Sequence, residues 1–316
     1  MPYACSFMTP LMISVIIPSY NSEGTINGCL RSLQEQSYRE DYEIILVDSS
    51  TDRTPEIVSE TYPNVRLIHL SRQTDPGTAR TIGIGESKGE LIAFIDSDCM
   101  AADNWLENIS LAHASSYNVI GGSVSNWNHG NSPVSWAGYI SEFREFIPER
   151  PMGEVSHIAA CNISYKKEVF RKHGAFKSGL YPQEDLVFNV RLSKAGEKIL
   201  FDPTVKVHHQ TRTRWRDFLQ HQERIGFITS QVLKVIPLKG SFIVRHPTLA
   251  PFLLPLLPFV KFVRTLWVFL RFQPRAVTAH PLVLLMFAIG LVFWLLGFAR
   301  GIYEKPLLEA GTQANL

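Results

Sequence analysis

Short apolar runs alternate with amphipathic segments along the first part of the chain, and this alternation restricts the fold more than any other feature. The runs have strand length, and they are MISVII (12–17), EIILV (43–47), VRLIHL (65–70), LIAFI (91–95) and NVIGGSV (118–124). Helices are predicted between them, over 26–33, from Thr54 as N-cap and Pro55 as first helical residue, over 79–88 and over 102–114. This order predicts right-handed βαβ units, so we expect an α/β fold with a Rossmann-like, mostly parallel sheet and flanking helices.

Acidic residues follow two of the predicted strands. Asp48 ends the run at 43–47, and Asp96 and Asp98 follow the run at 91–95. In parallel sheets ligands bind beyond the carboxyl ends of the strands, so these acids lie where a ligand is expected. Residues i and i+2 of an extended backbone point the same way, and two carboxylates placed so favour Mg²⁺ or Mn²⁺. The alternative is a polar turn in which Asp98 caps a neighbouring segment.

Several function classes are excluded by what the sequence lacks. The loop after the first strand reads PSYNSEG instead of GxGxxG, and no GxxxxGK[ST] phosphate loop occurs. The net charge of +2 is too small to indicate a nucleic-acid partner. Four cysteines without CxxC spacing indicate neither a zinc site nor a disulfide framework, and they favour a reduced, cytosol-facing compartment.

Four ordered motifs resemble those of family-two glycosyltransferases, which are inverting enzymes of the GT-A fold. The motifs are SVIIPSYN (14–21), the VD of ILVDSSTD (45–52), ARTIGIGESKGELIAFIDSD (79–98) and QEDLVFNVRLSKAG (183–196), and the resemblance spans about residues 13 to 225. It implies a bound nucleotide-diphosphate sugar, and the residues it assigns to this donor are Pro18, Tyr20, Asn21, Asp48, Arg80, Asp96 and Ser97. It also implies Mg²⁺ or Mn²⁺ on Asp98 and Asp96, and leaves open whether Asp96 touches the metal or the ribose.

The chain departs from the family pattern at two places. Ser49 stands where the family often has a second acid, and Thr81 stands where it has the Asn of an Ala-Arg-Asn triplet. The contact with base or ribose is therefore open at Ser49. Arg80 matches the arginine of the triplet and is expected to face the diphosphate. The alternative is a solvated arginine on the surface of a helix.

The resemblance implies that Glu184 and Asp185 act in catalysis, with Asp185 as the base. A sugar hydroxyl is a poor nucleophile, and a carboxylate within reach takes its proton as it attacks the anomeric carbon. The leaving nucleotide diphosphate is neutralised by the metal, so no acid from the protein is required. The apolar spacing after this pair predicts a helix, and the alternative is a first-turn acid pair favoured by the helix dipole.

Basic and aromatic residues gather in VHHQTRTRWRDFLQHQERIG (207–226). In many family members a histidine near this position completes the metal site, and His209 fits this role best, with His208 second. The contacts expected with a diphosphate or with the acceptor are those of His208, Arg212, Arg214 and Trp215. The alternative is an amphipathic helix on a membrane surface. The QxxRW string of processive relatives is one residue too long here, which argues against a processive synthase.

The C-terminal part of the chain is strongly apolar. The stretch PLVLLMFAIGLVFWLLGFA (281–299) carries no charge and is close to the about 20 residues that span a bilayer. The stretch 247–272 is interrupted by prolines, Lys261 and Arg264, so it either spans or lies in the interface as a broken helix. We expect a glycosyltransferase domain over 11–240 and a membrane segment over 247–300, with one or two transmembrane helices. Two spans with both ends cytosolic are preferred.

These predictions combine into a membrane-anchored, metal-dependent inverting glycosyltransferase whose catalytic domain faces the cytoplasm. Its acceptor is expected to be a hydroxyl of a membrane-proximal glycan or of a lipid-linked molecule. Two alternatives remain at this stage. One is transfer to a polyprenyl phosphate, and the other is a non-catalytic, membrane-tethered protein that binds nucleotide sugars.

Overall fold

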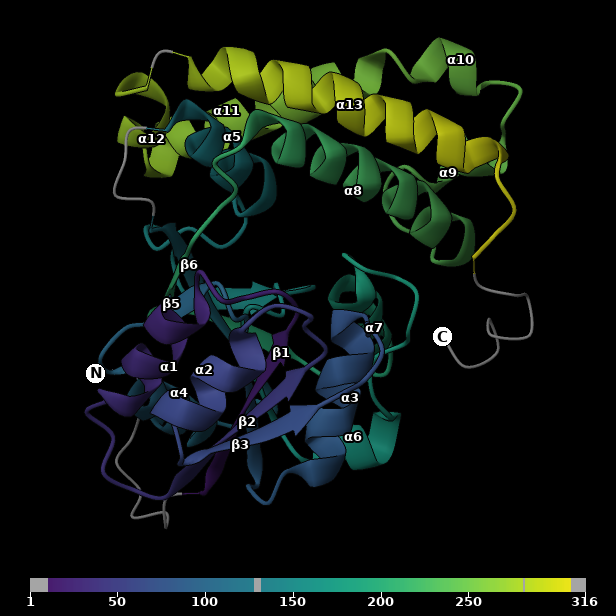
Figure 1. Cartoon of the computed structure of the whole chain (residues 1–316). Helices are drawn as coiled ribbons and strands as arrows, with labels where there is room; N and C mark the ends of the chain where they lie inside the picture. The colour runs from purple at the N-terminus through teal and green to yellow at the C-terminus, as the bar shows by residue number, and fades with distance from the viewer. Residues whose placement is uncertain (1–10, 128–131, 281, 308–316) are drawn as a thin grey trace.

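The fold is a nine-stranded sheet with helices on its faces and a layer of further helices beyond the carboxyl ends of its first strands (Figure 1). The computed structural model describes residues 11–127, 132–280 and 282–307. The strands are β1 Ile13–Ser19, β2 Tyr42–Asp48, β3 Val65–His69, β4 Leu91–Ile95, β5 Cys99–Ala101, β6 Val119–Asn126, β7 Gly153–Val155, β8 Asn162–Lys166 and β9 Ile199–His209. The five strands predicted from apolar runs are all present.

The sheet has a parallel part and a mixed part. Its order is β3-β2-β1-β4-β8-β6-β9-β5, with β7 paired to β9, and the first four strands are parallel. Beyond β4 only the β6–β9 pair is parallel, and the pairs that β8, β5 and β7 make are antiparallel. The predicted α/β fold with flanking helices is therefore confirmed, and its sheet is parallel in the first half and mixed in the second. The returning strands lack the helix-by-helix alternation on which the prediction rested.

The helices around the sheet are α1 Ile26–Gln34, α2 Thr54–Thr61, α3 Pro76–Glu86, α4 Trp105–His113, α6 Glu168–His173 and α7 Glu184–Lys194. The N-cap predicted at Thr54 is wrong, because the N-cap of α2 is Arg53. The Thr54 hydroxyl instead donates to Asp52 at 2.6 Å and accepts from the Ser22 N–H at 2.9 Å. The loop after β1 is thereby tied to the start of α2.

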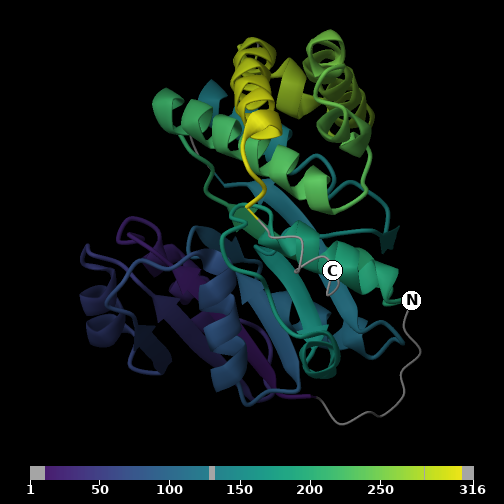
Figure 2. The same ribbon diagram turned by 90° about the vertical axis from the view of Figure 1, so that its right-hand side faces the viewer.

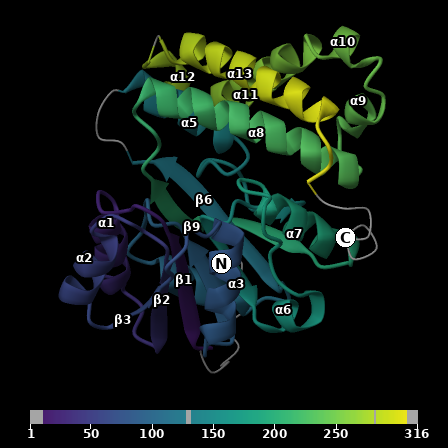
Figure 3. The same ribbon diagram turned by 45° about the vertical axis from the view of Figure 1, so that its right-hand side comes forward.

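The remaining helices form one layer above the sheet domain, as Figures 1 and 3 show from two sides. They are α5 Pro133–Glu142, α8 Trp215–Val235, α9 Ser241–Arg245, α10 Ala250–Leu253, α11 Leu256–Phe272, α12 Arg275–Thr278 and α13 Val283–Tyr303. Two stretches, Ala250–Phe272 and Val283–Tyr303, are long and apolar enough to cross a membrane by length and composition. Buried Phe218 of α8, Phe269 of α11 and Phe287 of α13 belong to the same hydrophobic core as the sheet, so the layer is packed onto the domain.

Helices α8 and α13 run side by side, with α8 between α13 and the sheet domain (Figure 1). Glycines make this close approach possible. A Cβ on Gly297 would lie 1.9 Å from the backbone oxygen of Glu223, and one on Gly226 would lie 1.9 Å from that of Trp294. Both distances are far below van der Waals contact, so any larger residue would separate the two helix backbones.

We expect Gly297→Ala to destabilise the protein by about 1–3 kcal/mol, because the added methyl overlaps backbone atoms that cannot move independently. The measurement is the free energy of unfolding in urea. Gly85→Ala is the matched control, since Gly85 also lies in a helix but has no atom within 4 Å of the added Cβ. Alanine favours a helix over glycine by about 1 kcal/mol, so the control should be neutral or stabilised. Equal effects of the two substitutions would contradict the close packing of α8 and α13.

Candidate functional site

A cleft of about 1110 Å³ opens between the carboxyl edge of the parallel strands and helix α8. Residues from β1 and its following loop, from the start of α3 and from the turn after β4 line its floor. Its upper wall comes from α8 and α13. Of the residues predicted to bind a nucleotide sugar, those that line the cleft are Pro18, Tyr20, Asn21, Arg80, Asp96 and Ser97, and the predicted metal ligand Asp98 is there too.

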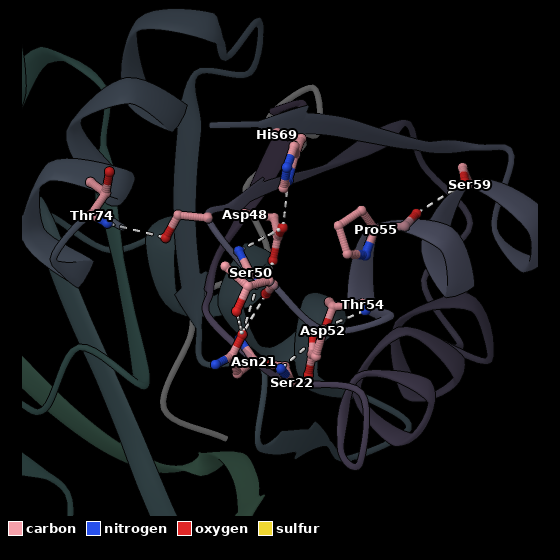
Figure 4. A network of polar contacts seen from close by, with 12 residues as sticks. Asn21, Ser22, Asp48, Ser50, Asp52, Thr54, Pro55, Ser59, His69 and Thr74 are labelled. Carbon is pink, nitrogen blue, oxygen red and sulfur yellow. Dashed lines mark hydrogen bonds and ion pairs between the residues drawn. The ribbon is translucent and has the colours of Figure 1, made fainter. Parts of the chain in front are cut away.

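The loop after β1 is held by a polar network (Figure 4). Asn21 adopts a positive φ of 51°, and its Oδ1 accepts the N–H of Thr51 at 2.9 Å. The Asn21 N–H donates to the Ser50 hydroxyl at 2.7 Å, and that hydroxyl donates to Asp48. The loops that follow β1 and β2 therefore form one rigid rim, which presents Tyr20 to solvent at 42% exposure.

Asp48 is fully buried behind this rim and is not one of the residues that line the cleft. One of its oxygens lies 2.8 Å from Nδ1 of His69 and also accepts the N–H of Ser50 at 3.0 Å. The carboxylate thus orders Ser50, which in turn orders Asn21. The nucleoside contact of Asp48 stays a prediction, and the role visible in its hydrogen bonds is to position the rim.

Arg80 connects the acids of the site, so the alternative of a solvated helix arginine is wrong. Its side chain is 3% exposed; Nη2 donates to Asp96 and Nη1 to Glu184, each at 2.6 Å. Burial opposes the positive charge, but Asp96 and Glu184 outweigh it and raise the pKa of the Arg80 guanidinium. Burial raises the pKa of Glu184, against the opposing charge of Arg80. One arginine therefore fixes two carboxylates from distant parts of the chain.

Asp98 and His209 meet at the turn between β4 and β5. The side chain of Asp98 is 38% exposed, and its Oδ1 lies 3.5 Å from Nε2 of His209. Strand pairing sets this geometry, because β5 pairs with β9 in a register that places Cys99 opposite His209. Nδ1 of His209 is buried and has no hydrogen-bond partner among the described residues. A carboxylate and an imidazole so arranged fit a divalent cation.

The thiol of Cys99 lies within 4.8 Å of the Asp98 and His209 ligand atoms. Its chemistry makes it a poor ligand for a hard cation. Burial raises the pKa of the Cys99 thiol well above its usual range, which disfavours the thiolate. Mg²⁺ and Mn²⁺ also prefer oxygen over thiol ligands. Among the described residues, Asp98 and His209 are therefore the better candidate ligands for such a cation, and Asp96 pairs with Arg80.

A second, smaller pocket of about 140 Å³ contains Asp185. Arg80, Asp96, Asp98, Tyr181 and Arg212 line both this pocket and the cleft, so the two spaces share a wall. Two predicted metal ligands, Asp96 and Asp98, consequently stand between the large cleft and the pocket that contains Asp185, whereas His209 lines the small pocket alone.

The Asp185 side chain is fixed by two backbone donors. Oδ2 accepts the N–H of Ala160 at 2.8 Å, and Oδ1 accepts the N–H of Leu186 at 2.7 Å. Burial raises the pKa of Asp185, while the Ala160 N–H and Arg80 act in the opposite direction. A raised pKa brings a carboxylate closer to the range in which it accepts and returns protons efficiently.

The cluster predicted at 207–226 divides between strand, loop and helix. His208 points to the face of β9 opposite His209, where its Nδ1 lies 2.9 Å from the Ser125 hydroxyl. Arg212 lines both pockets, as predicted for a phosphate contact. Arg214 is exposed outside them, and Trp215 packs on Phe218 with ring centroids 5.5 Å apart. The structure therefore brings Arg212 and His209 to the site, and does not bring His208, Arg214 or Trp215 there.

Sequence reasoning missed part of the pocket wall. Glu142 of α5 and His221 of α8 face each other there at 3.3 Å. Burial lowers the pKa of His221, while the negative charge of Glu142 acts in the opposite direction. His221 and Arg212 outweigh the effect of burial and hold the pKa of Glu142 at about 2. No motif marks Glu142, and only the spatial meeting of α5 with α8 reveals it.

The comparison with known protein families gives a direct match. The model of the family described as "Glycosyl transferase family 2" matches residues 14–174. Glycosyltransferase AglE of Haloferax volcanii is 30% identical over 224 residues, which cover 68% of this chain and 71% of that protein. The pre-mycofactocin glycosyltransferase of Mycobacterium tuberculosis is 23% identical over 223 residues, which cover 68% of this chain and 46% of that protein.

Solved structures share the fold. The mannosyltransferase PcManGT of Pyrobaculum calidifontis, in complex with GDP-Man and Mn²⁺, matches with a TM-score of 0.60 and 16% identity, over 96% of this chain and 91% of that one. Residues 1–349 of TarS from S. aureus, in complex with UDP, match with a TM-score of 0.53 and 19% identity, over 90% of each chain. At these identities the likeness establishes the GT-A fold.

Proposed function

Because the chain belongs to glycosyl transferase family 2, a family of sugar-transferring enzymes, we propose that it moves a sugar from a nucleotide-diphosphate donor to an acceptor hydroxyl with inversion. We assign the glycosyltransferase domain to residues 11–240 and the membrane segment to residues 247–300. The observation that carries the proposal is the wall shared by the two pockets. Asp96 and Asp98 lie between the large cleft and the pocket of Asp185, where a sugar between donor and acceptor would sit.

The large cleft receives the donor. The rim formed by Tyr20 and Asn21 takes the nucleoside, and Arg80 and Ser97 lie on the side of the diphosphate. The cleft volume of about 1110 Å³ suits a ligand of this size. Structures that share the fold contain UDP, UDP-GlcNAc or GDP-Man, which supports this class of donor.

Asp98 and His209 would hold the metal, and Asp96 is the third candidate ligand. Mg²⁺ or Mn²⁺ bound there would neutralise the charge that develops on the departing diphosphate. Arg80 fixes Asp96 through a hydrogen bond of 2.6 Å to its Oδ1. Burial of the imidazole of His209 keeps its ring in one orientation. Mn²⁺ in the PcManGT and GalNAc-T7 structures supports the assignment of the metal.

Asp185 takes the proton from the acceptor hydroxyl. The N–H groups of Ala160 and Leu186 hold its carboxylate in place in the small pocket. The hydroxyl oxygen then attacks the anomeric carbon from the side opposite the diphosphate, and the bond to the diphosphate breaks. A single displacement of this kind inverts the anomeric configuration.

The acceptor approaches from the side of the helical layer. Tyr181, Arg212 and the Glu142–His221 pair line the small pocket on that side. The two apolar helices of the layer favour an acceptor at the membrane, either a membrane-proximal glycan or a lipid-linked molecule. We place the catalytic domain in the cytoplasm as part of this proposal.

A specific observation also favours transfer to a polyprenyl phosphate as the second candidate. Arg212, Arg224 and Arg300 all line the upper wall of the cleft, next to the helical layer, and arginines suit a lipid phosphate. A phosphate acceptor is already ionised and needs no base, so the requirement for Asp185 separates the two candidates.

Release of nucleotide from a panel of sugar nucleotides tests the proposal. With Mg²⁺ or Mn²⁺ present, at least one donor should release its nucleoside diphosphate, and a chelator should stop the release. Adding the metal back should restore it. Binding of every donor without turnover, with lipid extracts supplied as acceptor, would indicate the non-catalytic alternative.

A further inference from the structure

Exposed large apolar side chains are concentrated on one part of the protein. Of the nineteen on the described residues, sixteen lie between Phe242 and Leu307. On α11 they recur along one side, at Leu256, Phe259, Val260, Val263, Trp267 and Leu270, with exposures of 47–67%. On α13 they recur at Leu282, Leu285, Ile289, Val292, Leu296 and Tyr303. We call these two stripes together the outer face, and a face of this size marks a contact with a partner or a membrane.

Three polar side chains of α11 contact other parts of the protein. Arg264 pairs with Glu145 at 2.7 Å, and Arg144 donates to the Thr265 hydroxyl at 3.3 Å. Lys261 lies over the Trp294 ring of α13, 4.2 Å from its centroid. Lys261 is also the midpoint of the apolar stretch 250–272. A spanning α11 would therefore carry these charges and Glu145 to the centre of the bilayer, where charged side chains are costly.

Helix α13 packs along its length against α8, a helix that carries charged residues. Gly290 meets Phe218, Gly297 meets Glu223, and Gly301 meets Ser230, so α8 follows α13 in parallel. Arg300 pairs with Glu223 at 2.8 Å, and both line the donor cleft. If α13 crossed the bilayer in this packing, α8 and the upper wall of the cleft would enter the hydrocarbon with it.

The positive charge of residues 239–305 favours a surface of anionic lipids. Residues 239–305 contain eight Lys or Arg residues and one acid, Glu304. Among the exposed ones are Lys239, Arg245, Arg271 and Arg275. A helix with an apolar face and basic residues around it binds at the headgroup level of anionic lipids, where Trp residues such as Trp267 also favour the interface.

We propose that α11 and α13 lie in the plane of an anionic bilayer, as one interfacial layer that dips its outer face among the lipids and does not cross. The donor cleft then opens directly beneath the headgroups, with Arg300 at the boundary. Figures 1 and 2 show α13, in yellow, on the far side of α8 from the sheet domain. The proposal rests on the membrane location given in the proposed function. It adds that the acceptor is reached from the headgroup region of the bilayer.

The depth of a fluorophore in the bilayer tests this arrangement on the full chain. Cys5 is replaced by Ser, and one cysteine for labelling is introduced at Leu282, Val292 or Tyr303. Along a helix these positions cover about 32 Å, close to the thickness of the hydrocarbon core. Vesicles of phosphatidylcholine and phosphatidylglycerol carry a quencher at a shallow or a deep position of the acyl chain. The label is a small environment-sensitive fluorophore. A label at Leu111→Cys is the control, because Leu111 is 49% exposed on α4, outside the layer.

An in-plane layer predicts the same shallow depth at all three positions, no quenching at position 111, and weaker binding when phosphatidylglycerol is removed. A gradient of depth would overturn the proposal in favour of a span. In that case the label at Val292→Cys would be deepest, and the labels at 282 and 303 would lie near opposite faces of the bilayer. Absence of quenching at all three positions would also overturn it. These readouts need no catalysis, so the proposal can fail while the sugar transfer stands, and an inactive enzyme leaves the depth result valid.

Discussion

Asp185→Asn should lower kcat by about 10²–10⁴-fold, the usual contribution of a positioned general base. The amide keeps the size of the side chain but cannot take the proton of an acceptor hydroxyl. Donor binding should be nearly unchanged, because Asp185 lines the small pocket and not the donor cleft. The measurements are steady-state turnover and the Kd of the nucleotide sugar.

The matched control is Asp217→Asn. Asp217 is an exposed acid in the first turn of α8, just as Asp185 lies in the first turn of α7. If Asp185 served only the helix dipole, both variants would lose a little stability and keep their activity. A second readout is the acidic limb of kcat/KM. Since burial raises the pKa of Asp185, activity should fall with decreasing pH already above about 3.9, the ordinary value for aspartate.

Asp98→Ala should reduce metal-dependent kcat/KM by about 10²–10³-fold, the size of the loss when one charge-stabilising group is removed from an active site. Its carboxylate is the exposed member of the pair with His209, and no other described residue replaces it at that point. Turnover should be titrated with Mn²⁺ in the wild type and in the variant, with thermal unfolding as a check on the fold.

The neighbouring histidines supply an internal control for this metal site. His209→Ala should raise the Mn²⁺ concentration for half-maximal activity at least about 10-fold, as loss of a ligand or its support does. His208→Ala should leave that concentration unchanged, because His208 lies on the other face of β9 beside Ser125. Equal weakening by the two variants would show that the site had been placed on the wrong residues.

The parallel half of the fold follows from the sequence because local signals and tertiary packing agree there. LIAFI at 91–95 is predicted as a buried strand, and β4 is fully buried over the same residues. The placement of Asp96 and Asp98 at the carboxyl edge follows from the same argument. The contact of Arg80 with Glu184 was not predicted, because the two residues are 104 positions apart and no local pattern connects them.

The mixed half of the sheet and the upper wall of the site could not be derived in this way. Strand β8 inserts antiparallel between β4 and β6, and such a choice depends on packing across the whole sheet. Glu142 becomes part of the site only because α5 packs beside α8. Arg300 belongs to an apolar segment that composition separates from the catalytic domain, yet glycine-mediated packing brings it to the cleft.

The anomeric configuration of the first product shows whether transfer is a single displacement assisted by Asp185. With the donor identified by the panel, Mn²⁺ and no acceptor, water takes the place of the hydroxyl beside Asp185. Proton NMR, recorded faster than the released sugar equilibrates, should show the anomer opposite to that of the donor, and Asp185→Asn should release almost none. Release with the donor's own configuration would contradict a single displacement assisted by Asp185.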